Sequence, residues 1–258
     1  MNNQSKNILI VNDDGITAKG IHNLVRAMLP LGKITVVAPD SPQSGMGHAV
    51  TIHGIIRARV YDMQIHESLK SYTCSGTPVD AVKLALAHLM PVKPDLIVSG
   101  INHGSNSSIN VIYSGTMSAA VEGAVEGIPS IGFSLLDWAA DADFDAAAHY
   151  ARIIAEKVLN NGIPKYSCLN VNIPRCQLNE IKGVKICRQA KAVWKENFEK
   201  RTDPMGHDYF WMTGTFTNLD LGEDTDEFAL AHNYISIVPV QHDLTAHHLM
   251  QELNDWTF

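Results

Sequence analysis

The hydrophobic residues along the chain fall into short apolar runs that alternate with stretches of helical spacing. Each run is bounded by polar or turn-forming residues, which is typical of strands buried on both faces of a parallel sheet. The predicted strands of this series are Ile8–Val11, Ile34–Ala38, Leu96–Ser99, Ile131–Leu135 and Leu169–Ile173. Between them the apolar positions return every three or four residues, as on one face of an α-helix.

The predicted helices have recognisable starts and ends. Thr77, Pro78 and Asp80 form a typical helix start, with a hydroxyl cap, a proline in the first turn and an acidic residue after it. Asn161 and Gly162 form a typical helix end. The predicted helices cover about 21–28, 78–89, 114–125 and 143–159. This alternation predicts an α/β fold: a Rossmann-like, mostly parallel sheet with helices on both faces.

The pattern changes from about Cys187 onward. Residues Phe210–Gly214 have the pattern of a hairpin strand, and the acidic segment Glu223–Glu227 is interpreted as a solvated loop. A further strand is predicted at Tyr234–Val238, followed by a short C-terminal helix from about Leu244. We therefore expect a C-terminal extension, made of a hairpin and a helix, on the α/β core.

The composition is that of an ordinary globular protein. Of 258 residues, 45% are hydrophobic and 18% are charged, which allows one large domain with a sizeable core. The formal net charge of −7 gives no electrostatic basis for binding nucleic acid or an anionic membrane. The run Ile8–Val11 is too short for a signal peptide or a membrane span, and the four cysteines form no CxxC pair. We therefore expect a cytoplasmic protein.

Polar, oxygen-rich segments directly follow three of the predicted strands. These segments are 12–15 (NDDG), 39–45 (PDSPQSG) and 100–106 (GINHGSN). In an open parallel sheet the carboxyl ends of the strands lie at one edge, and ligands bind there. We therefore expect the three segments to converge, although they are far apart in the sequence.

The adjacent aspartates Asp13 and Asp14 are the strongest chemical signal in these segments. In a continuing strand their side chains would face opposite sides, but Gly15 permits a tight turn that brings both carboxylates to one point. Two close carboxylates repel each other unless a cation lies between them, and oxygen ligands suit Mg²⁺ or Mn²⁺ better than Zn²⁺. Taken alone, Asp-Asp-Gly is more often an ordinary turn, and Ser44 and Asn102 are weak signals by themselves. Their expected convergence favours a site.

Residues Tyr113–Thr116 precede a helix rich in alanine and valine. The backbone N–H groups of Gly115 and Thr116 would lie at the helix N-terminus, where such groups bind phosphate. Ser114 can equally be a simple helix cap. The two interpretations have about equal support from this motif.

The histidines give weaker signals. His48 and His103 flank the expected site, where either would be placed to contact a phosphate or protonate a leaving oxygen, although most such histidines are ordinary surface groups. Asp243 and His247 are four residues apart on the predicted last helix, a spacing that favours a charge pair or an interface contact over catalysis.

Two known phosphoryl-transfer architectures fit the acidic segment poorly. In phosphatases of the haloacid dehalogenase type, alignment with Asp14 and Gly15 places Asn12 at the nucleophile position, and an amide cannot form an aspartyl-phosphate. A response-regulator receiver requires an aspartate after its third strand, where this chain has Asn102.

Six segments occur in a fixed order and at natural spacing from residue 8 to about residue 250. They are ILIVNDDGITAKGI, VVAPDSPQSGMG, CSGTPVDAV, DLIVSGINHGSN, VIYSGTMSAAVEG and DTDEFALAHNYISIVPVQHDLTAH. No segment is specific alone, but as a set they resemble the SurE family of 5'/3'-nucleotidases. The segment from about Arg188 to Gly222 matches this family least well.

This resemblance implies a metal-dependent phosphomonoesterase that hydrolyses nucleoside 5'- and 3'-monophosphates in a single step with a metal-activated water. It implies one divalent cation, Mg²⁺ or Mn²⁺, with the ligands Asp13, Asp14, Ser44 and Asn102. The two aspartates are the expected catalytic residues. The expected phosphate contacts are Asn106, Ser114, Gly115 and Thr116.

The resemblance also implies a single domain over residues 1–258. A Rossmann-like catalytic core is expected over about 1–186, and a C-terminal extension that mediates homodimers or homotetramers over about 187–258. Two other functions stay open at this point. One is a broad-specificity phosphatase that also attacks short polyphosphate, and the other is a non-catalytic nucleotide-binding module.

Overall fold

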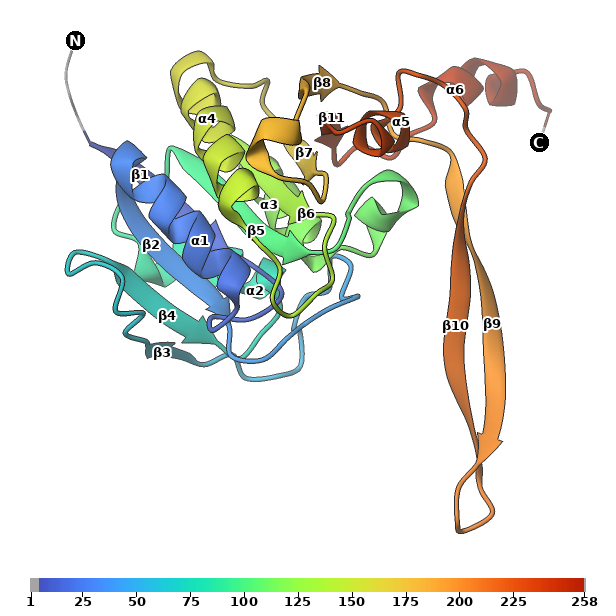
Figure 1. Cartoon of the computed structure of the whole chain (residues 1–258), viewed down its shortest axis with the longest axis horizontal. Helices are drawn as coiled ribbons and strands as arrows, with labels where there is room; N and C mark the ends of the chain where they lie inside the picture. The colour runs from blue at the N-terminus through green and yellow to red at the C-terminus, as the bar shows by residue number, and fades with distance from the viewer. Residues whose placement is uncertain (1–4, 258) are drawn as a thin grey trace.

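The computed structural model describes residues 5–257. It contains one large twisted sheet with helices on both faces, and a long two-stranded hairpin that projects away from this body (Figure 1). The expected α/β fold with a mostly parallel sheet is confirmed.

Within residues 5–257 the large sheet has nine strands. They are β1 Lys6–Val11, β2 Gly32–Pro39, β3 Ala58–Val60, β4 Lys70–Cys74, β5 Leu96–His103, β6 Ser130–Leu135, β7 Ser167–Ile173, β8 Gly183–Ile186 and β11 Tyr234–Gln241. Their order is β3-β4-β2-β1-β5-β6-β7-β11-β8, and neighbours run parallel except in the pairs β3–β4 and β7–β11. Every predicted strand is present, and β3, β4 and β8 were not predicted.

Helices cover both faces of the sheet. The helices packed on it are α1 Lys19–Met28, α2 Pro78–Leu84, α3 Gly115–Val125, α4 Asp145–Asn161 and α5 Asp226–Ala231. The chain also forms the short 3₁₀ helix η3 Ser108–Ile112 and the helix α6 His247–Asn254, which buries none of its residues. On one face α1 and α4 cover Ile8 and Ile10, and on the other face α2 and α3 cover Leu9 and Val11. Since successive strand residues face opposite sides, this double cover explains the continuous apolar run of β1.

The order in which the strands are added to the sheet reverses at β1, near the middle of the sheet. From β1 it proceeds to β2 and β4 on one side, and it later returns to β5 on the other side. The crevice at the carboxyl ends of β1 and β5 is therefore a topological switch point, where open α/β sheets bind ligands.

The local helix signals are confirmed. Thr77 caps α2: its Oγ1 accepts a hydrogen bond from the N–H of Asp80 at 3.1 Å, and the Asp80 carboxylate accepts one from the N–H of Thr77 at 2.9 Å. Gly162 ends α4 with a φ of +71°. The α-helical part of α2 is shorter than predicted because the chain continues from Ala85 to Leu89 as a π-helical turn.

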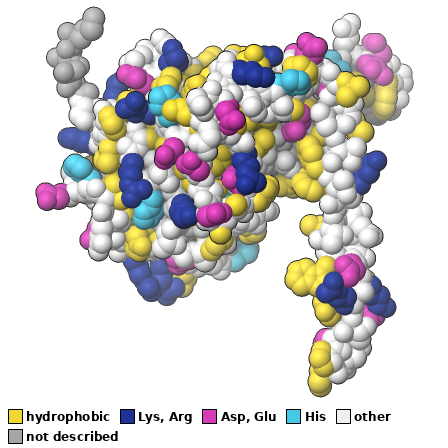
Figure 2. All heavy atoms as spheres, viewed as in Figure 1, with side chains coloured by type: hydrophobic (Ala, Val, Ile, Leu, Met, Phe, Trp, Pro, Cys, Tyr) yellow, Lys and Arg dark blue, Asp and Glu magenta, His cyan; other side chains and the backbone are white. Residues whose placement is uncertain are grey.

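The hairpin, called the arm below, consists of β9 Ala192–Thr202 and β10 Asp208–Asn218. It confirms the predicted hairpin near Phe210. Figure 2 shows hydrophobic side chains along its surface, and those of Phe198, Phe210 and Trp211 are exposed. The arm therefore presents apolar surface that the rest of the described chain does not cover.

The acidic segment Glu223–Glu227 is not the solvated loop that was predicted. Thr225 caps α5, and Asp226 is fully buried. The predicted charge pair near the C-terminus is confirmed, with 2.8 Å between Asp243 Oδ2 and His247 Nε2, although Asp243 precedes α6. No helix within residues 5–257 is long and apolar enough to span a membrane.

Candidate active site

Residues from several parts of the chain line one small cavity at the carboxyl edge of the sheet. Its volume is about 160 Å³. The lining includes Asp13 after β1, Ser44 after β2, Asn102 at the end of β5, Asn106 in the loop that follows, and Ser114 before α3. The three polar segments therefore meet, as expected from parallel strands that end at one edge.

Asp13 is buried against the start of α3. Its carboxylate accepts hydrogen bonds from the hydroxyl and the backbone N–H of Thr116. Burial and the charge of Asp14 nevertheless raise the pKa of Asp13 to about 6. A nearby cation would offset both effects and stabilise the ionised carboxylate.

Asp14 is half-buried, and its Oδ2 accepts a hydrogen bond from the N–H of His103 at 3.2 Å. Burial raises the pKa of Asp14 despite this bond. The expected tight turn is present: Gly15 has a φ of +96°, and the Nδ2 of Asn12 donates to the Gly15 carbonyl at 2.8 Å. The turn thus holds both aspartates at the same edge of the sheet.

The loop after β2 is held against Asp13 by backbone contacts. The N–H of Gln43 donates to the carbonyl oxygen of Asp13 at 2.8 Å, so the next residue, Ser44, lies beside the aspartates. Further along, Gly47 packs so closely that a Cβ on it would lie 2.3 Å from the carbonyl oxygen of Ile112. Both ends of this loop are therefore anchored to site segments.

Asn102 lies within β5 and not in a turn after it. The strand continues to His103 beyond a bulge between Ser99 and Asn102, which corrects the predicted strand end at Ser99. The Nδ2 of Asn102 donates to the carbonyl oxygens of His103 and Gly104 at 3.0 and 2.9 Å. The amide oxygen lies on the other side of the group and is available as a ligand.

Asn106 is fixed by a buried amide network that was not predicted. Its Nδ2 donates to Ser134 Oγ at 2.7 Å, and its N–H donates to Asn172 Oδ1 at 2.8 Å. Its carbonyl oxygen accepts from Asn170 Nδ2 at 2.8 Å. Asn170 and Asn172 share one face of β7, and two polar residues at this spacing inside an apolar run are the sequence signal that could have identified them.

The first turn of α3 bonds to its own helix and to Asp13 in this structure. Ser114 is the cap residue, and its Oγ accepts from the N–H of Met117 at 2.9 Å. Gly115 lies against Asp13, because a Cβ on it would stand 2.7 Å from the Asp13 Cβ. Together with Thr116 this turn adjoins the cavity, and its contact with phosphate stays a prediction.

The two flanking histidines have different surroundings. His103 lines the cavity, and its ring contacts Phe144 edge-on at a centroid distance of 4.9 Å. His48 instead lies 3.1 Å from a carboxylate oxygen of the buried Glu122, with Lys83 on the other oxygen. His103 is therefore the histidine that lies at the candidate site.

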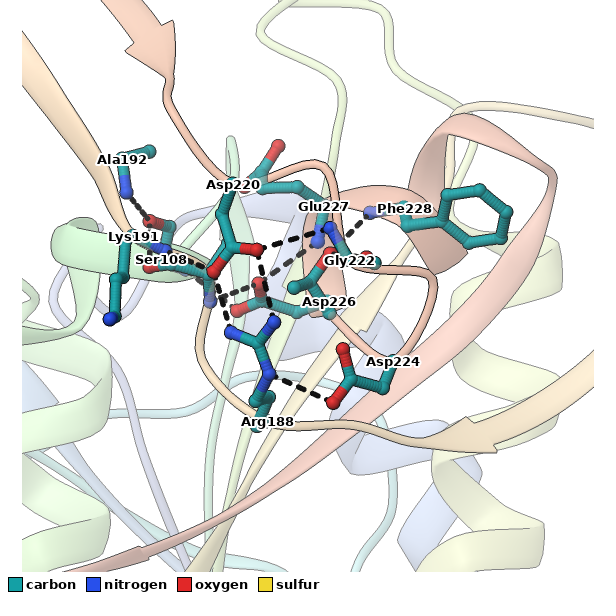
Figure 3. Close-up of polar contacts among 12 residues, drawn as sticks. Ser108, Arg188, Lys191, Ala192, Asp220, Gly222, Asp224, Asp226, Glu227 and Phe228 are labelled. Atoms are coloured by element: carbon teal, nitrogen blue, oxygen red, sulfur yellow. Dashed lines mark hydrogen bonds and ion pairs between the residues drawn. The ribbon is translucent and has the colours of Figure 1, made fainter.

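The acidic segment ties the loop after β5 to the base of the arm (Figure 3). The buried carboxylate of Asp226 accepts hydrogen bonds from the N–H groups of Ser108 at 2.7 Å and Ala190 at 2.9 Å. The hydroxyl of Ser107 donates to Glu227. Backbone donors that need an acceptor therefore explain why Asp226 is buried.

Arg188 adds ion pairs at the same place (Figure 3). Its guanidinium bonds both oxygens of Asp220, and its Nε donates to Asp224 at 2.8 Å. The first of these contacts holds the pKa of Asp220 well below its usual value. These ion pairs join the two ends of the arm to the segment that precedes α5.

Three aromatic side chains border the cavity: Tyr113, Trp138 and Trp194. Trp194 belongs to the arm strand β9, and its Nε1 donates to Asn110 Oδ1 at 2.8 Å. Tyr113 begins the motif before α3 but was not expected to border the cavity, and no motif in the sequence marks Trp138 or Trp194.

The oxygen donors at the cavity fit a hard divalent cation. Within residues 5–257, no group of three or more His, Cys, Asp and Glu side chains is arranged to hold a metal. Asp13, Ser44 and Asn102 line the cavity, whereas Asp14 follows Asp13 in the turn and is not part of the lining. A cation at this edge would therefore need the oxygens of Ser44 and Asn102 as well as carboxylate oxygens. Burial raises the pKa of Asp13 and of Asp14, and such a cation would stabilise both carboxylates in their ionised form.

Comparison with known proteins identifies the family. A family model described as "Survival protein SurE" matches residues 8–196. The 5'-nucleotidase SurE of Christiangramia forsetii is 57% identical over 257 residues, which cover 100% of this chain and 99% of that protein. The 5'-nucleotidase SurE of Flavobacterium psychrophilum is 57% identical over 249 residues, 96% of each chain. The crystal structure of a SurE protein from Aquifex aeolicus has a TM-score of 0.82 at 39% identity, covering 96% of this chain and 98% of that chain. Because this similarity extends over nearly its whole length, the chain belongs to the SurE family.

Proposed function

We propose that the chain hydrolyses nucleoside 5'- and 3'-monophosphates to nucleoside and phosphate, with one divalent cation as its cofactor. The relatives that are named 5'-nucleotidases support the reaction class. The observation that carries the proposal is the cavity at the switch point, where Asp13, Ser44 and Asn102 meet beside the start of α3. It combines a place for a cation with a helix N-terminus that favours phosphate.

The proposed cation ligands are Asp13, Asp14, Ser44 and Asn102. When bound, Mg²⁺ or Mn²⁺ neutralises charge on phosphoryl oxygens and lowers the pKa of a bound water. The two aspartates support this assignment because burial raises both of their pKa values, that of Asp13 to about 6. A pair of carboxylates in such a place is stabilised by a cation.

The phosphate is bound and oriented by the chain's own groups. The first turn of α3, at Ser114, Gly115 and Thr116, provides the positive end of the helix dipole and backbone N–H donors, of which that of Thr116 bonds Asp13 in this structure. Asn106, held in place by its amide network, is the proposed side-chain contact to the same oxygens. Donors fixed before the reaction stabilise the charge that develops on phosphoryl oxygens. Asp13 or Asp14 orients the attacking water by accepting its hydrogen bond.

The substrate range is tested by rates of phosphate release from AMP, 3'-AMP and tripolyphosphate. We expect release from both mononucleotides, at higher rates than from tripolyphosphate. Release from tripolyphosphate at equal or higher rates would favour a broad-specificity phosphatase. Tight nucleotide binding without any release would favour the non-catalytic binding module.

The division into a core over about 1–186 and an extension over about 187–258 is part of the same proposal. The exposed apolar side chains of the arm support a role in homodimers or homotetramers. The extension also completes the sheet, because β11 lies between β7 and β8. The four free cysteines support a cytoplasmic location.

A further inference from the structure

Trp138 lies at the rim of the cavity with one face of its ring open to solvent. It follows β6 and is 77% exposed. A Cβ built on Gly104 would lie 2.2, 2.3 and 2.5 Å from Cζ2, Cη2 and Cε2 of the indole. Three consecutive ring atoms at nearly equal distance place Gly104 under the ring face and not at its edge. The indole therefore covers Gly104 with one face and presents the other.

The backbone around Trp138 is fixed from two sides. The preceding residue, Asp137, is buried, and its carboxylate lies 3.2 Å from the Nε of Arg175. The N–H of Gly104 donates to the carbonyl oxygen of Leu135 at 2.8 Å, which joins the two loops that meet under the ring. The backbone that carries the indole, and the glycine under it, are therefore held in place by contacts within the chain.

Two further aromatic side chains border the same cavity. The indole of Trp194 is fixed by its hydrogen bond to Asn110 and by an edge contact with Phe216 at a centroid distance of 5.5 Å. Tyr113 is about half exposed. Tyr113 and Trp194 also line an adjoining hollow of about 360 Å³. The small cavity and this larger hollow thus share the aromatic side chains Tyr113 and Trp194.

We infer that Trp138, with Tyr113 and Trp194, forms the subsite that receives the nucleobase, an inference that rests on the proposed function. A substrate whose phosphate lies at Asp13 and Asn102 carries a flat aromatic base within the same small molecule. An open indole face binds such a base by stacking. Because every base has a π face, the subsite accepts all bases, and kcat/KM follows the stacking area. We expect purine nucleotides to be the best substrates, pyrimidine nucleotides the next, and ribose 5-phosphate the poorest.

The test compares AMP with ribose 5-phosphate, which has no base. Trp138→Ala is expected to lower kcat/KM for AMP about 5- to 100-fold and to leave kcat/KM for ribose 5-phosphate unchanged. Trp138→Phe is expected to retain most of the activity on AMP because phenylalanine keeps a stacking face. The matched control is Tyr166→Ala, which removes an exposed aromatic side chain at the amino end of β7. It should leave kcat/KM unchanged for both substrates. Equal losses for both substrates, or no loss for AMP, would overturn the subsite while the nucleotidase proposal stands.

A binding measurement distinguishes failure of the subsite from failure of the proposed function. The chain has four tryptophans, so the signal is the difference in fluorescence quenching by AMP between the wild type and Trp138→Ala. We expect a quenched component that only the wild type shows. If the wild type showed this component but released no phosphate from AMP, the proposed function would fail and the subsite would stand. Identical quenching in the two proteins would overturn the subsite.

Discussion

Gly115 lies directly against Asp13: a Cβ on Gly115 would stand 2.7 Å from the Cβ of Asp13 and 3.0 Å from its Oδ2. Because α3 begins at Gly115, the missing side chain lets the positive end of the helix approach the carboxylate. This contact brings the proposed cation ligands and the proposed phosphate-binding turn together.

Replacing Gly115 with alanine should reduce catalysis more than stability. Alanine stabilises a helix by about 1 kcal/mol relative to glycine, but its methyl group at position 115 must displace Asp13. We expect Gly115→Ala to lower phosphate release from AMP at least about tenfold, since small displacements of catalytic groups are costly. Gly123→Ala, in the same helix, would place a Cβ 2.2 Å from Oγ of the buried Ser130. That control should lower Tm by overpacking and leave the folded enzyme active. Full activity in Gly115→Ala would contradict the proposal that Asp13 and the start of α3 form the active site.

Asp13→Asn and Asp14→Asn should each abolish turnover in a protein that stays folded. An asparagine at position 13 still accepts the hydrogen bond from Thr116 but carries no charge for a cation. We expect phosphate release to fall at least about 100-fold. Saturating Mn²⁺ should raise the Tm of the wild type and not that of the variants, since a ligand stabilises only the state that binds it. Asp145→Asn, at an exposed position in α4, is the control. A near-normal rate in either variant would show that the ligand set is wrong.

The parts of the molecule whose signals are local could be predicted. The start of α2 followed from Thr77 and Asp80 because a capping box needs only neighbouring residues. The convergence of Asp13, Ser44 and Asn102 followed from one property of the topology, since parallel strands end at the same edge.

The parts that depend on distant groups could not be predicted. Nothing beside Asp226 distinguishes it from a solvated acid, because the backbone N–H groups that bury it come from Ser108 and Ala190. The indole of Trp138 is at the site only because Gly104, from another loop, lies under it. The short strand β4 alternates polar and apolar residues too briefly to stand out.

Asp226 and its neighbour Asp224 provide a matched pair of substitutions. Asp226→Asn keeps one oxygen and converts the other into an NH2 donor, so it removes the acceptor of one of the two buried N–H groups, those of Ser108 and Ala190. We expect a loss of about 1–3 kcal/mol in the free energy of unfolding. It should also lower activity, because the loop that carries Asn106 is released. Asp224→Asn breaks only an exposed ion pair with Arg188 and should lower the free energy of unfolding much less. Urea denaturation measures both. Equal losses in the free energy of unfolding for the two substitutions would contradict the role of Asp226 as the buried acceptor that holds this loop.

Glu122 should contribute stability that depends on pH. Its buried carboxylate bonds His48 and pairs with Lys83, and these contacts hold its pKa below the usual value of 4.5. For an acid whose pKa is lowered on folding, the contribution is full above the unfolded pKa and is lost as pH falls through the folded pKa. Glu122→Gln should therefore destabilise the protein by about 1–3 kcal/mol at pH 7. The difference in the free energy of unfolding between the wild type and this variant should disappear as the pH falls below 4.5. A difference that did not depend on pH would contradict the stabilising role of the Glu122 carboxylate.

Shortening the arm should reduce the size of the oligomer and leave the core folded. Phe198 and Met212 are directly opposite in the ladder, so a two-residue Asn-Gly turn joining them preserves the register of the remaining strands. Light scattering after size-exclusion chromatography should report a smaller mass for this variant than for the wild type. Trp194 is retained, so activity on AMP measures whether the site is intact. An unchanged mass would contradict the proposed role of the arm.

Phosphate release from AMP by the purified protein, with Mn²⁺ or Mg²⁺ and then with excess EDTA, tests the central claim most directly. The proposed site predicts release that EDTA abolishes and that added metal restores, because Asp13 and Asp14 alone cannot replace the cation. Folded protein that released no phosphate from any mononucleotide with either metal, or released it equally well in EDTA, would contradict the claim.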